Sequence, residues 1–488
     1  METDSDYITE ESDDNNDDIS IQSNPEQETS DDTINTINSI NDITTVDESI
    51  FDTWTEEDIE EITNNIYELF EEYHKTNIIS ISSPNFYENI INTTSEIIFQ
   101  DLVSGGLCYQ DDFDEIHEFT ENLLDLFLDF SHWQRRSVSY VSNHQSTNLS
   151  KTSETAKKIK ALQEIPQPKQ KSKEWHEFRY NLISASNLWK VLGSESQKNS
   201  LIYDKCCPLH TNQPNYFNST ESPMHWGNKY EPLTVMVYEQ MYQTTVGEFG
   251  CIQHPNYPFI GASPDGINID PTNQLFGRML EIKNIVNREI TGTPKEEYWV
   301  QTQIQMETCD LEECDFVETR FLEYSEEAAF YADQTREYKG IILCFIERTI
   351  TANNQVAKSN DPVYVYMPLD VSLDTETLME WTRQQKEEKR ESGLVLLNTI
   401  YWYLEEFSCV FIGRNRAWFS AAAPKIEAVW NTILEERVGG YEHRAPKKKS
   451  VRKINASIDD TTNSYMLENM PVTNSFCLIR LDEDGNVL

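Results

Sequence analysis

The chain has 488 residues, of which 38% are hydrophobic, and its formal net charge at pH 7 is -45. This length allows one large core with appended segments, or two to three domains, and no apolar run is long enough to cross a bilayer, so we expect no membrane association. The first residues lack the basic and apolar regions of a secretory signal, and nine cysteines without such a signal indicate reduced intracellular thiols rather than a disulfide framework.

The negative charge is concentrated in the first quarter of the chain. Residues 1–134 contain 36 Asp and Glu residues but a single basic residue, Lys75. The remaining 354 residues contain 48 acidic and 38 basic residues, a net charge of only -10. The charge therefore argues against nucleic-acid binding by the first quarter but leaves it open for the rest of the chain.

Two acidic segments of different character begin the chain. Residues 1–50 are rich in Asp, Glu, Asn, Ser and Thr and offer few apolar side chains to offset the entropy of ordering, which predicts a disordered tail. Residues 51–134 remain acidic, but "IEEITNNIYELFEEYH" and "FDEIHEFTENLLDLFLDF" within them place apolar residues at helical intervals. A small acidic helical domain is therefore predicted here.

The rest of the chain divides into four segments. Residues 135–172 are basic, and "IPQPKQKSK" among them predicts an extended linker. Patterns typical of helices and strands alternate over residues 173–370, which predicts a compact α/β core. Residues 371–440 contain "TETLMEWTRQQKEEKRESGLVLLNTIYWYLEEF" and "AWFSAAAPKIEAVWNTILEERVGG", which predict a helical C-terminal extension closed by two glycines. Residues 441–488 form a tail that is first basic and then mixed.

The stretch "GASPDGINIDPTNQLFGRMLEIK" carries charges into a region that otherwise predicts two buried strands. Residues 259–263 and "RMLEIK" predict the strands, and the Asp-Pro and Gly between them suit a hairpin connection. Because side chains alternate along a strand, Glu281 and Lys283 share one face, and the hairpin brings Asp265 beside Glu281. Neighbouring carboxylates repel unless a cation joins them, and a hard divalent ion such as Mg²⁺ is the natural partner. Lys283 would then orient or deprotonate a water, or stabilise charge on a phosphate.

The same hairpin residues have a simpler explanation. Asp-Gly is a common turn signal, and Glu-x-Lys is common on exposed strands. Taken alone, "SPDG" and "LEIK" therefore do not decide between a catalytic site and an ordinary exposed hairpin.

Five motifs in order extend the pattern beyond the hairpin: "EWHEFRYNLISASNLWKVLG", "WGNKYEP", "GASPDGI", "LEIK" and "YWVQTQIQM". Together, over residues 173–320, they resemble the lambda exonuclease and YqaJ-type viral recombinase nuclease family of the PD-(D/E)xK superfamily. With its acidic, Asn-rich start, the chain is similar to a giant-virus member of this family that is associated with a virophage-resistance element. The resemblance implies a restriction-endonuclease-like mixed sheet flanked by helices, here joined to the acidic helical N-terminal domain and the helical C-terminal extension.

The resemblance also assigns roles to individual residues. Glu231 of "WGNKYEP", Asp265 and Glu281 match the carboxylates that bind metal in the family. Lys283 matches its catalytic lysine. Gln303 of "YWVQTQIQM" matches a glutamine that lies beside the site on the following helix. The alternative for this glutamine is a place on the polar face of an amphipathic element.

A phosphate pocket is the second feature that the resemblance implies. Arg179 of "EFRYNLISAS" matches an arginine that holds a terminal 5'-phosphate together with serines, here Ser186 and Ser263. An arginine fork suits bidentate phosphate contact, although a surface helix arginine is the simpler explanation of the residue alone. One position departs from the pattern: Pro232 directly follows Glu231, and because proline disfavours helix at the preceding residue, we expect Glu231 at a helix start or kink.

These residues imply a metal-dependent deoxyribonuclease. One or two Mg²⁺ or Mn²⁺ ions on the three carboxylates would support phosphodiester hydrolysis. The phosphate pocket implies a 5'-to-3' exonuclease that favours 5'-phosphorylated ends of duplex DNA, with endonuclease activity left open, in viral DNA recombination, repair or defence. The alternative is a nuclease-fold DNA-binding or assembly module with an inactive or ancillary site. The complete set of Glu231, Asp265, Glu281 and Lys283 favours the enzyme.

The cysteines do not predict further metal sites. Cys206, Cys207 and His210 lie close together, but zinc sites usually show pairs spaced as C-x2-C. Some nucleases related to the family hold an iron–sulfur cluster on four cysteines. After Cys309 and Cys314 this chain has only isolated cysteines, so no iron-sulfur cluster is expected.

DNA is the expected partner, in duplex form and with free ends. Members of the family form rings on DNA, but no ring interface is evident in the sequence, and a homodimer is our expectation. The acidic N-terminal region suits a protein-partner surface, a DNA mimic or a solubilising segment. The basic run at residues 443–453 suits DNA contact, a nuclear address or a solvated tail. We expect an intracellular protein of the host cytoplasm, at the viral factory, or of the nucleus if this run acts as an address.

Overall fold

The computed structural model describes residues 49–131, 133–139, 150–166, 168, 172–209, 222–350, 356–358 and 362–445. The predicted disordered tail except Ser49 and Ile50, the predicted final tail beyond Ala445, and His210 lie outside these residues. All described residues belong to one compact unit. Within it, no helix is both long and apolar enough to cross a membrane.

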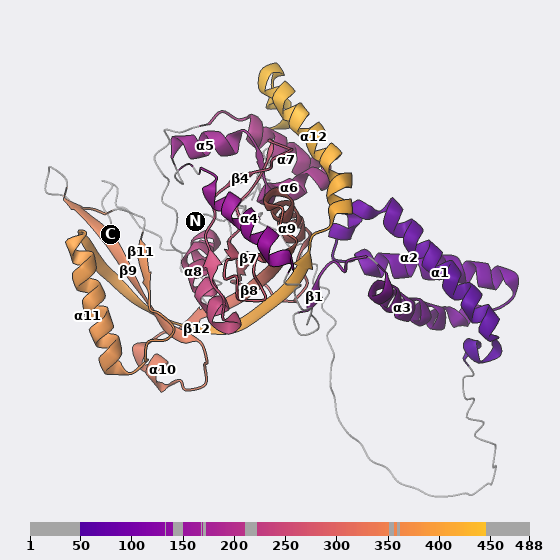
Figure 1. The fold of residues 1–488 in the computed structure, drawn as a ribbon, viewed down its shortest axis with the longest axis horizontal. Helices are drawn as coiled ribbons and strands as arrows, with labels where there is room; N and C mark the ends of the chain where they lie inside the picture. Colours follow the sequence, from indigo (N-terminus) through magenta and orange to yellow (C-terminus); the bar gives the residue numbers. More distant parts are fainter. Residues whose placement is uncertain are drawn as a thin grey trace, which may run out of the picture. The chain divides into compact units, whose positions relative to one another are not determined.

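Three helices form the first part of the described chain: α1 (Glu56–Thr76), α2 (Phe86–Gly105) and α3 (Phe113–Phe130) (Figure 1). Thr55 caps the start of α1 through its side chain, and Gly106, with a φ of 72°, ends α2. The helices enclose an apolar core of their own, which includes Ile66, Phe70, Ile90, Ile116 and Leu124. The helical periodicity of this region is therefore confirmed as helix.

A mixed, nine-stranded sheet follows. Its strands are β1 (Val138–Ser139), β3 (Val246–Gly247), β6 (Gly266–Asn268), β7 (Met279–Asn284), β8 (Glu313–Glu323), β9 (Lys339–Ile350), β10 (Val356–Lys358), β11 (Val363–Tyr366) and β12 (Leu394–Gly413). The order is β10-β9-β12-β8-β7-β6-β3, with β1 on β12 and β11 on β9. Among the described strands of this sheet, only β7 and β8 pair in parallel, and α9 (Glu296–Cys309) supplies the crossover that a parallel pair requires.

A second sheet and the remaining helices complete the unit. The second sheet has the order β2-β5-β4 and consists of β2 (Ile183–Ser184), β4 (Ile252–Gln253) and β5 (Ile260–Ala262). The helices are α4 (Ser150–Glu164), α5 (Lys173–Tyr180), α6 (Ala185–Leu192), α7 (Glu195–Cys206), α8 (Pro223–Tyr242), α10 (Glu327–Ala332), α11 (Thr375–Glu391) and α12 (Arg416–Gly439). The structure confirms a mixed α/β class.

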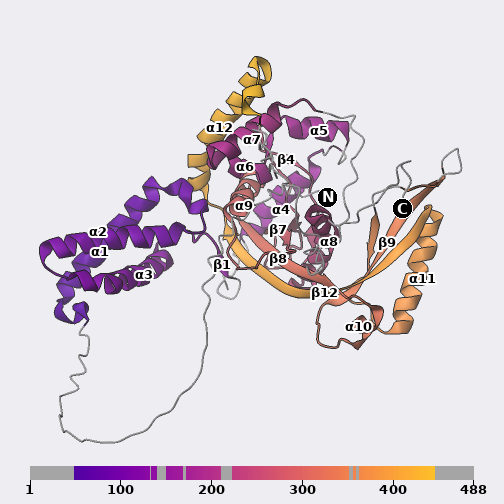
Figure 2. The same cartoon turned by 180° about the vertical axis from the view of Figure 1, so that it is seen from behind.

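The central strands are covered on both faces, which is why they are apolar. On one face, Phe316 of β8 packs in the largest core with residues of α6, α7, α9 and α12. On the other face, Leu280 and Ile282 of β7 pack against Tyr238 of α8. The helices labelled α8 and α9 therefore enclose the strand that carries the predicted catalytic residues (Figure 2).

Part of the predicted linker at residues 135–172 is regular structure. β1 pairs with β12, and α4 is a 15-residue helix. Lys158 of α4 forms an ion pair with Asp310 just after α9, with Nζ and Oδ2 2.8 Å apart. The expectation of an extended segment was wrong here because the basic side chains of α4 mask a short apolar face, where Ile159 and Leu162 are buried.

The predicted helical extension at residues 371–440 is also only partly helical. α11 ends before Gly393, whose φ of 78° favours glycine. The next 20 residues form β12, which pairs with β9 along its first half and with β8 along its second half. The helix prediction was wrong for this segment because its β-branched and aromatic residues favour a strand once neighbouring strands are available. α12 ends at the predicted glycines.

α8 continues through Pro232, so Glu231 lies inside the helix and not at its start. Proline removes one N–H from the helical ladder and crowds the preceding turn. The hydroxyl of Tyr366 donates a hydrogen bond of 2.6 Å to the carbonyl of Lys229 in that turn. This bond attaches the turn before Pro232 to β11, but it does not replace the missing bond, which an N–H at position 232 would have donated to the Asn228 carbonyl.

Candidate active site

The predicted partner strand at residues 259–263 was wrong, because β5 pairs with β2 and β4 in the second sheet. The hairpin is formed instead by β6, within the predicted connection, and β7, and it places Asp265 against the strand that carries Glu281. In the pairing of β6 with β7, Gly266 lies opposite Leu280. The N–H of Asp265 donates to the Leu280 carbonyl over 3.2 Å, and its Oδ2 accepts the N–H of Ile282 over 2.7 Å. These two bonds lie on either side of Glu281 in the sequence, so the backbone fixes the two carboxylates as neighbours.

Glu281 is fully buried, and both of its carboxylate oxygens have polar neighbours. Lys283 lies on the same face, as strand alternation predicts, with its Nζ 2.6 Å from Oε1. Gln305 of α9 donates from Nε2 to Oε2 over 2.6 Å and contacts the Ser263 carbonyl at 3.3 Å. The short distance from Oε1 to the Lys283 ammonium makes this a close, buried ion pair.

The cluster holds more negative charge than Lys283 can balance. Burial raises the pKa of Asp265 well above its ordinary value, and the charges of Glu281 and Glu231 raise it further. Burial by itself would lower the pKa of Lys283, but the neighbouring Glu281 and Asp265 raise it above its ordinary value. The electrostatics therefore favour an additional cation beside these carboxylates.

Glu231 adds a third carboxylate from α8. Its side chain is buried, and burial together with the negative charge of Glu281 raises its pKa to about 7. Lys229 lies one half-turn earlier in α8, but its Nζ contacts Glu323 at 2.5 Å. The nearest lysine in sequence is therefore engaged by another acid.

The donor set fits a hard divalent cation. Carboxylate oxygens are the ligands that Mg²⁺ and Mn²⁺ prefer, and the side chains of Asp265, Glu281 and Glu231 are all buried. Across the part of the chain that the structure describes, no group of three or more His, Cys, Asp or Glu side chains is positioned to hold a metal ion. Binding through one or two carboxylates, which is common for Mg²⁺, is compatible with both observations.

Gln303 is not brought to the carboxylates. Its Nε2 donates to the Gly413 carbonyl over 2.9 Å, and its Oε1 accepts the N–H of Asn415 over 2.7 Å, so it supports the junction of β12 and α12. Gln305 contacts Glu281 instead. An α-helix turns by about 100° per residue, so side chains two positions apart point in nearly opposite directions. Treating this segment as a helix would have grouped Gln305 with Gln301 and separated both from Gln303.

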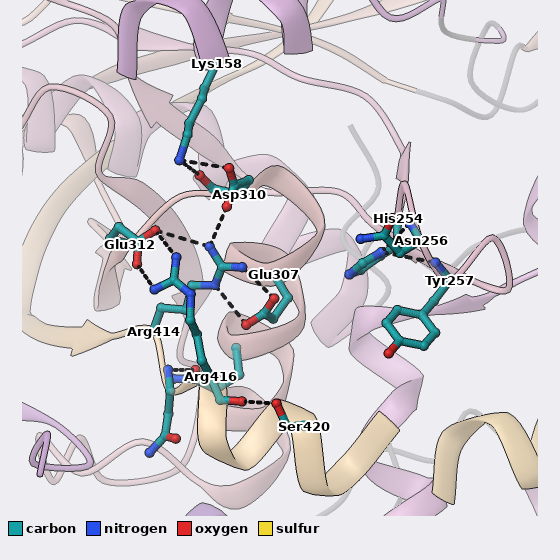
Figure 3. A network of polar contacts seen from close by, with 12 residues as sticks. Lys158, His254, Asn256, Tyr257, Glu307, Asp310, Glu312, Arg414, Arg416 and Ser420 are labelled. Atoms are coloured by element: carbon teal, nitrogen blue, oxygen red, sulfur yellow. Dashed lines mark hydrogen bonds and ion pairs between the residues drawn. The ribbon is translucent and has the colours of Figure 1, made fainter. Parts of the chain in front are cut away.

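The C-terminal end of α9 is held by a network of ion pairs (Figure 3). Arg414 makes a bidentate contact with Glu307, at 2.8 and 2.6 Å, and also contacts Asp310 at 2.8 Å. Lys158 reaches Asp310 from α4. Glu307 lies about half a turn after Gln305, so this network restricts the helix that positions Gln305.

The N-terminal end of α9 is held by Arg136. This buried residue donates to the carbonyls of Ser82, at 2.9 Å, and Pro294, at 2.5 Å. The indole of Trp299 in α9 donates to the Arg136 carbonyl over 2.8 Å. Burial lowers the pKa of Arg136 to about 10, which still leaves it charged at neutral pH. The contacts tie α9 to the three-helix bundle.

The predicted phosphate-binding serines lie at one end of the small sheet. β2 and β5 pair in parallel with Ser184 opposite Gly261, so Ser186 and Ser263 each follow this pair by two residues. The hydroxyl oxygens of Ser186 and Ser184 are 3.2 Å apart. Gln305 links the Ser263 carbonyl to the carboxylate cluster. The strand pairing therefore places both serines after the same end of the small sheet, and Gln305 connects Ser263 to Glu281.

Arg179 lies on α5, upstream of these serines. Its guanidinium carbon is 4.7 Å from the ring centre of Trp175, and the Lys205 ammonium donates to its carbonyl over 3.0 Å. Stacking on an aromatic ring fixes the plane of a guanidinium, as bidentate recognition of a phosphate requires.

All eight cysteines in the described ranges are free. Burial raises the pKa of Cys309 to about 12 and that of Cys314 well above its ordinary value. Burial in the core is therefore the dominant influence on both thiols.

Comparison with known proteins identifies one domain. Residues 174–312 match the family model described as the YqaJ-like viral recombinase domain. This match confirms the resemblance predicted from the five motifs, and it contains every predicted site residue.

A relative and two solved structures are similar to this chain. Uncharacterized protein R354 of Acanthamoeba polyphaga mimivirus is 28% identical over 306 residues, 57% of this chain and 54% of that protein. The chain thus spans about half the length of this curated relative, and the association with a virophage-resistance element stays a prediction. The alkaline exonuclease LHK-Exo from Laribacter hongkongensis, also solved in complex with dAMP, is 18% identical, covers 55% of this chain and 94% of its own, and has a TM-score of 0.32. A phage-related exonuclease from Haemophilus somnus 129PT is 12% identical, covers 52% and 96%, and has a TM-score of 0.26.

Proposed function

We propose, from the YqaJ-like domain at residues 174–312, that this protein is a metal-dependent deoxyribonuclease that hydrolyses phosphodiester bonds of duplex DNA. We propose further that it acts from 5'-phosphorylated ends in the 5'-to-3' direction, in viral DNA recombination, repair or defence. We also propose that the mixed sheet and the helices on its faces form a restriction-endonuclease-like nuclease core.

The observation that carries the proposal is the buried pair of Asp265 and Glu281 beside the Lys283 ammonium, with the buried Glu231 near enough for its charge to raise the pKa of Asp265. Buried charges cost free energy, and apolar residues of similar volume often serve a purely structural strand better. A bound cation would compensate the negative charge of these carboxylates and offset the cost of burying them.

The chemistry follows from the positions of these side chains. Hydrolysis forms a bond from a water oxygen to phosphorus and breaks the bond from phosphorus to the leaving alkoxide. When bound by the carboxylates, one or two Mg²⁺ or Mn²⁺ ions would shield the phosphate charge and lower the pKa of water. Lys283 would hold the attacking water or donate to a phosphate oxygen. Gln305 would act as a positioning residue, because its amide fixes one oxygen of Glu281.

Selection of the DNA end is assigned to Arg179, Ser186 and Ser263. A terminal 5'-phosphate carries more negative charge than an internal phosphate and offers several acceptor oxygens to a guanidinium and hydroxyls. Binding it would set the scissile phosphate at a fixed distance from the carboxylates.

A DNA-binding or assembly module without catalysis is the second candidate. It is favoured by one observation: in the ranges described here, no preformed group of three metal-binding side chains is present. The two candidate functions differ in one measurable property: the nuclease cleaves DNA, and the binding module leaves it intact.

The proposal is tested with three substrates, each incubated with Mg²⁺ or with EDTA: linear duplex with 5'-phosphate, linear duplex with 5'-hydroxyl, and closed circular DNA. We expect Mg²⁺-dependent loss of the 5'-phosphorylated duplex, slower loss of the 5'-hydroxyl duplex, and little loss of circles. No Mg²⁺-dependent loss of any substrate would favour the non-catalytic module.

Asp265→Asn should abolish cleavage and weaken Mn²⁺ binding measured by calorimetry. Asp270→Asn is the matched control, because Asp270 lies in the same hairpin but bonds only its local Thr272. Loss of activity in both variants would show that the hairpin, and not the carboxylate cluster, is what matters. Arg179→Ala should remove the preference for 5'-phosphate, and an unchanged preference would exclude the phosphate pocket.

A further inference from the structure

The bundle of α1, α2 and α3 contains a groove that the nuclease site does not use. The groove has a volume of about 500 Å³ and is lined by one face of α1 and by the end of α2 with the following Leu107. α3 does not fill the groove. Phe127 of α3 packs on Tyr67 and Phe70 of α1, with ring centres 5.2 and 5.7 Å apart, and none of these three residues lines the groove.

The centre of the groove is apolar. Ile62, Ile98 and Leu102 form its floor and belong to the core of the bundle. Ile97 and Leu107 stand at its edge with 40% and 61% of their surface exposed. An exposed isoleucine and leucine beside an apolar floor indicate a surface that another apolar group covers.

The rim of the groove is acidic. Five carboxylates line it: Asp58, Glu61, Glu68, Glu72 and Asp101. Among the described residues none of the five forms an ion pair, and residues 49–131 contain only one basic residue, Lys75. Like charges around one groove repel, so a covering group gains most if it is positively charged.

We propose that this groove binds a basic amphipathic helix of a partner protein. The apolar floor would take leucine-like residues of that helix, and the rim would pair with lysines or arginines on either side of them. The α1 face from Asp58 to Glu72 is about 21 Å long, which matches a helix of about 14 residues. Three helices with an unfilled groove also leave the position that the fourth helix of a four-helix bundle would take.

Other classes of ligand suit the groove less well. DNA and acidic peptides would bring negative charge to five carboxylates. An added β-strand needs a sheet edge, and residues 49–131 of the structure contain no strand. A purely apolar helix would leave the acidic rim without partners.

The test uses the full-length protein and a fluorescent peptide of about 16 residues, with leucines at helical intervals and lysines elsewhere. Fluorescence anisotropy without DNA should show binding that weakens as salt is added. A scrambled peptide of the same composition should bind at least about tenfold more weakly, because its leucines no longer share one face.

Two variants of equal charge separate the groove from the general acidity of the bundle. Glu61→Lys with Glu68→Lys should weaken binding of the helical peptide at least about tenfold. Glu118→Lys with Glu121→Lys changes two exposed carboxylates of α3 outside the groove and should change it less than about twofold. Circular dichroism checks that both variants keep their helices.

Equal loss in the two variants, or equal binding of the scrambled peptide, would overturn the proposal in favour of diffuse electrostatic attraction. Light scattering tests a second occupant: a homodimer that the groove variant alone dissociates would show that the groove is covered by another copy of the chain. Because peptide binding is measured without DNA or metal, failure of the nuclease proposal leaves this result unaffected.

Discussion

At the scale of single residues, two glutamines two positions apart have different surroundings. Gln305 faces the carboxylate cluster, and Gln303 supports the start of α12. Both side chains are fully buried, so burial alone does not distinguish a residue of the site from one of the scaffold. Their hydrogen-bond partners do.

Alanine substitutions should separate the two roles. Gln305→Ala removes a donor to Glu281 and should lower the rate of DNA cleavage at least about tenfold, with a smaller change in stability. Gln303→Ala leaves the N–H of Asn415 and the Gly413 carbonyl without their partner and should lower the free energy of unfolding by about 1–3 kcal/mol. Initial rates and urea unfolding of both variants check this, and the same pattern of effects in both would contradict it.

His254 is a buried histidine held as a hydrogen-bond acceptor. Its Nδ1 accepts the N–H groups of Asn256 and Tyr257 at 3.1 and 3.2 Å (Figure 3), and its ring stacks on Phe419. Burial lowers its pKa below the ordinary value of 6.5, while Glu307 acts in the opposite direction. Protonation at Nδ1 would break both backbone bonds.

His254 should make the protein sensitive to mild acid. A histidine whose pKa is lowered by folding stabilises the fold fully above its ordinary pKa of 6.5, and this contribution is lost as pH falls below that value. His254→Asn keeps an acceptor oxygen but does not titrate. The free energy of unfolding should therefore fall less steeply between pH 6.5 and 5 in the variant, by up to about 1.4 kcal/mol per pH unit. Urea unfolding at a series of pH values measures both slopes, and identical slopes would exclude the prediction.

At the scale of elements, α9 connects the candidate site to distant parts of the chain. Arg414 and Lys158 hold its C-terminal end, and Arg136 holds its N-terminal end. These contacts come from the residue that follows β12, from α4 and from the segment before β1. The position of Gln305 therefore depends on elements outside the YqaJ-like domain.

Arg136 and its neighbour Arg135 offer a matched pair for testing this connection. Arg136→Met leaves the carbonyls of Ser82 and Pro294 without their donor and should cost about 3 kcal/mol of stability or more. Arg135→Met removes only half-exposed pairs with acidic residues of α3 and should cost about 1 kcal/mol or less. Thermal unfolding compares the two, and limited proteolysis between α3 and β1 should be faster in the Arg136 variant alone. Equal costs would mean that the buried contacts do not join the bundle to α9.

At the scale of the whole molecule, charge is unevenly distributed. Residues 1–134 carry a net charge of -35, whereas the remaining 354 residues carry -10. Repulsion between carboxylates is therefore concentrated in the first quarter of the chain, whereas acidic and basic residues are closer to balance after residue 134.

Salt should stabilise the bundle more than the core. Raising the ionic strength from 0.01 to 0.15 M shortens the Debye length from about 30 to about 8 Å, which screens repulsion among the exposed carboxylates of α1, α2 and α3. Hydrogen exchange of the bundle amides should slow, and exchange in β7 and β8 should change less. A uniform change across the chain would contradict this expectation.

The sequence by itself determined the features that arise from contacts between near neighbours in the chain. Alternation along a strand put Glu281 and Lys283 on one face, and helical spacing predicted α1 and α3. A hairpin near Asp265 was predicted, but the strand that pairs with β7 is β6 and not residues 259–263. Motif order identified the domain. These features need few residues and little tertiary context.

Only the tertiary structure decided the features that depend on distant partners. Gln303 and Gly413 are 110 residues apart in sequence, and their contact is why Gln303 is not the glutamine at the carboxylates. The strand β12 exists because β8 and β9 pair with it, although its sequence begins next to a strong helix. α8 continues through Pro232 although proline disfavours the interior of a helix. For Gln303 and β12, partners distant in the chain decide the outcome, and the local sequence cannot reveal them.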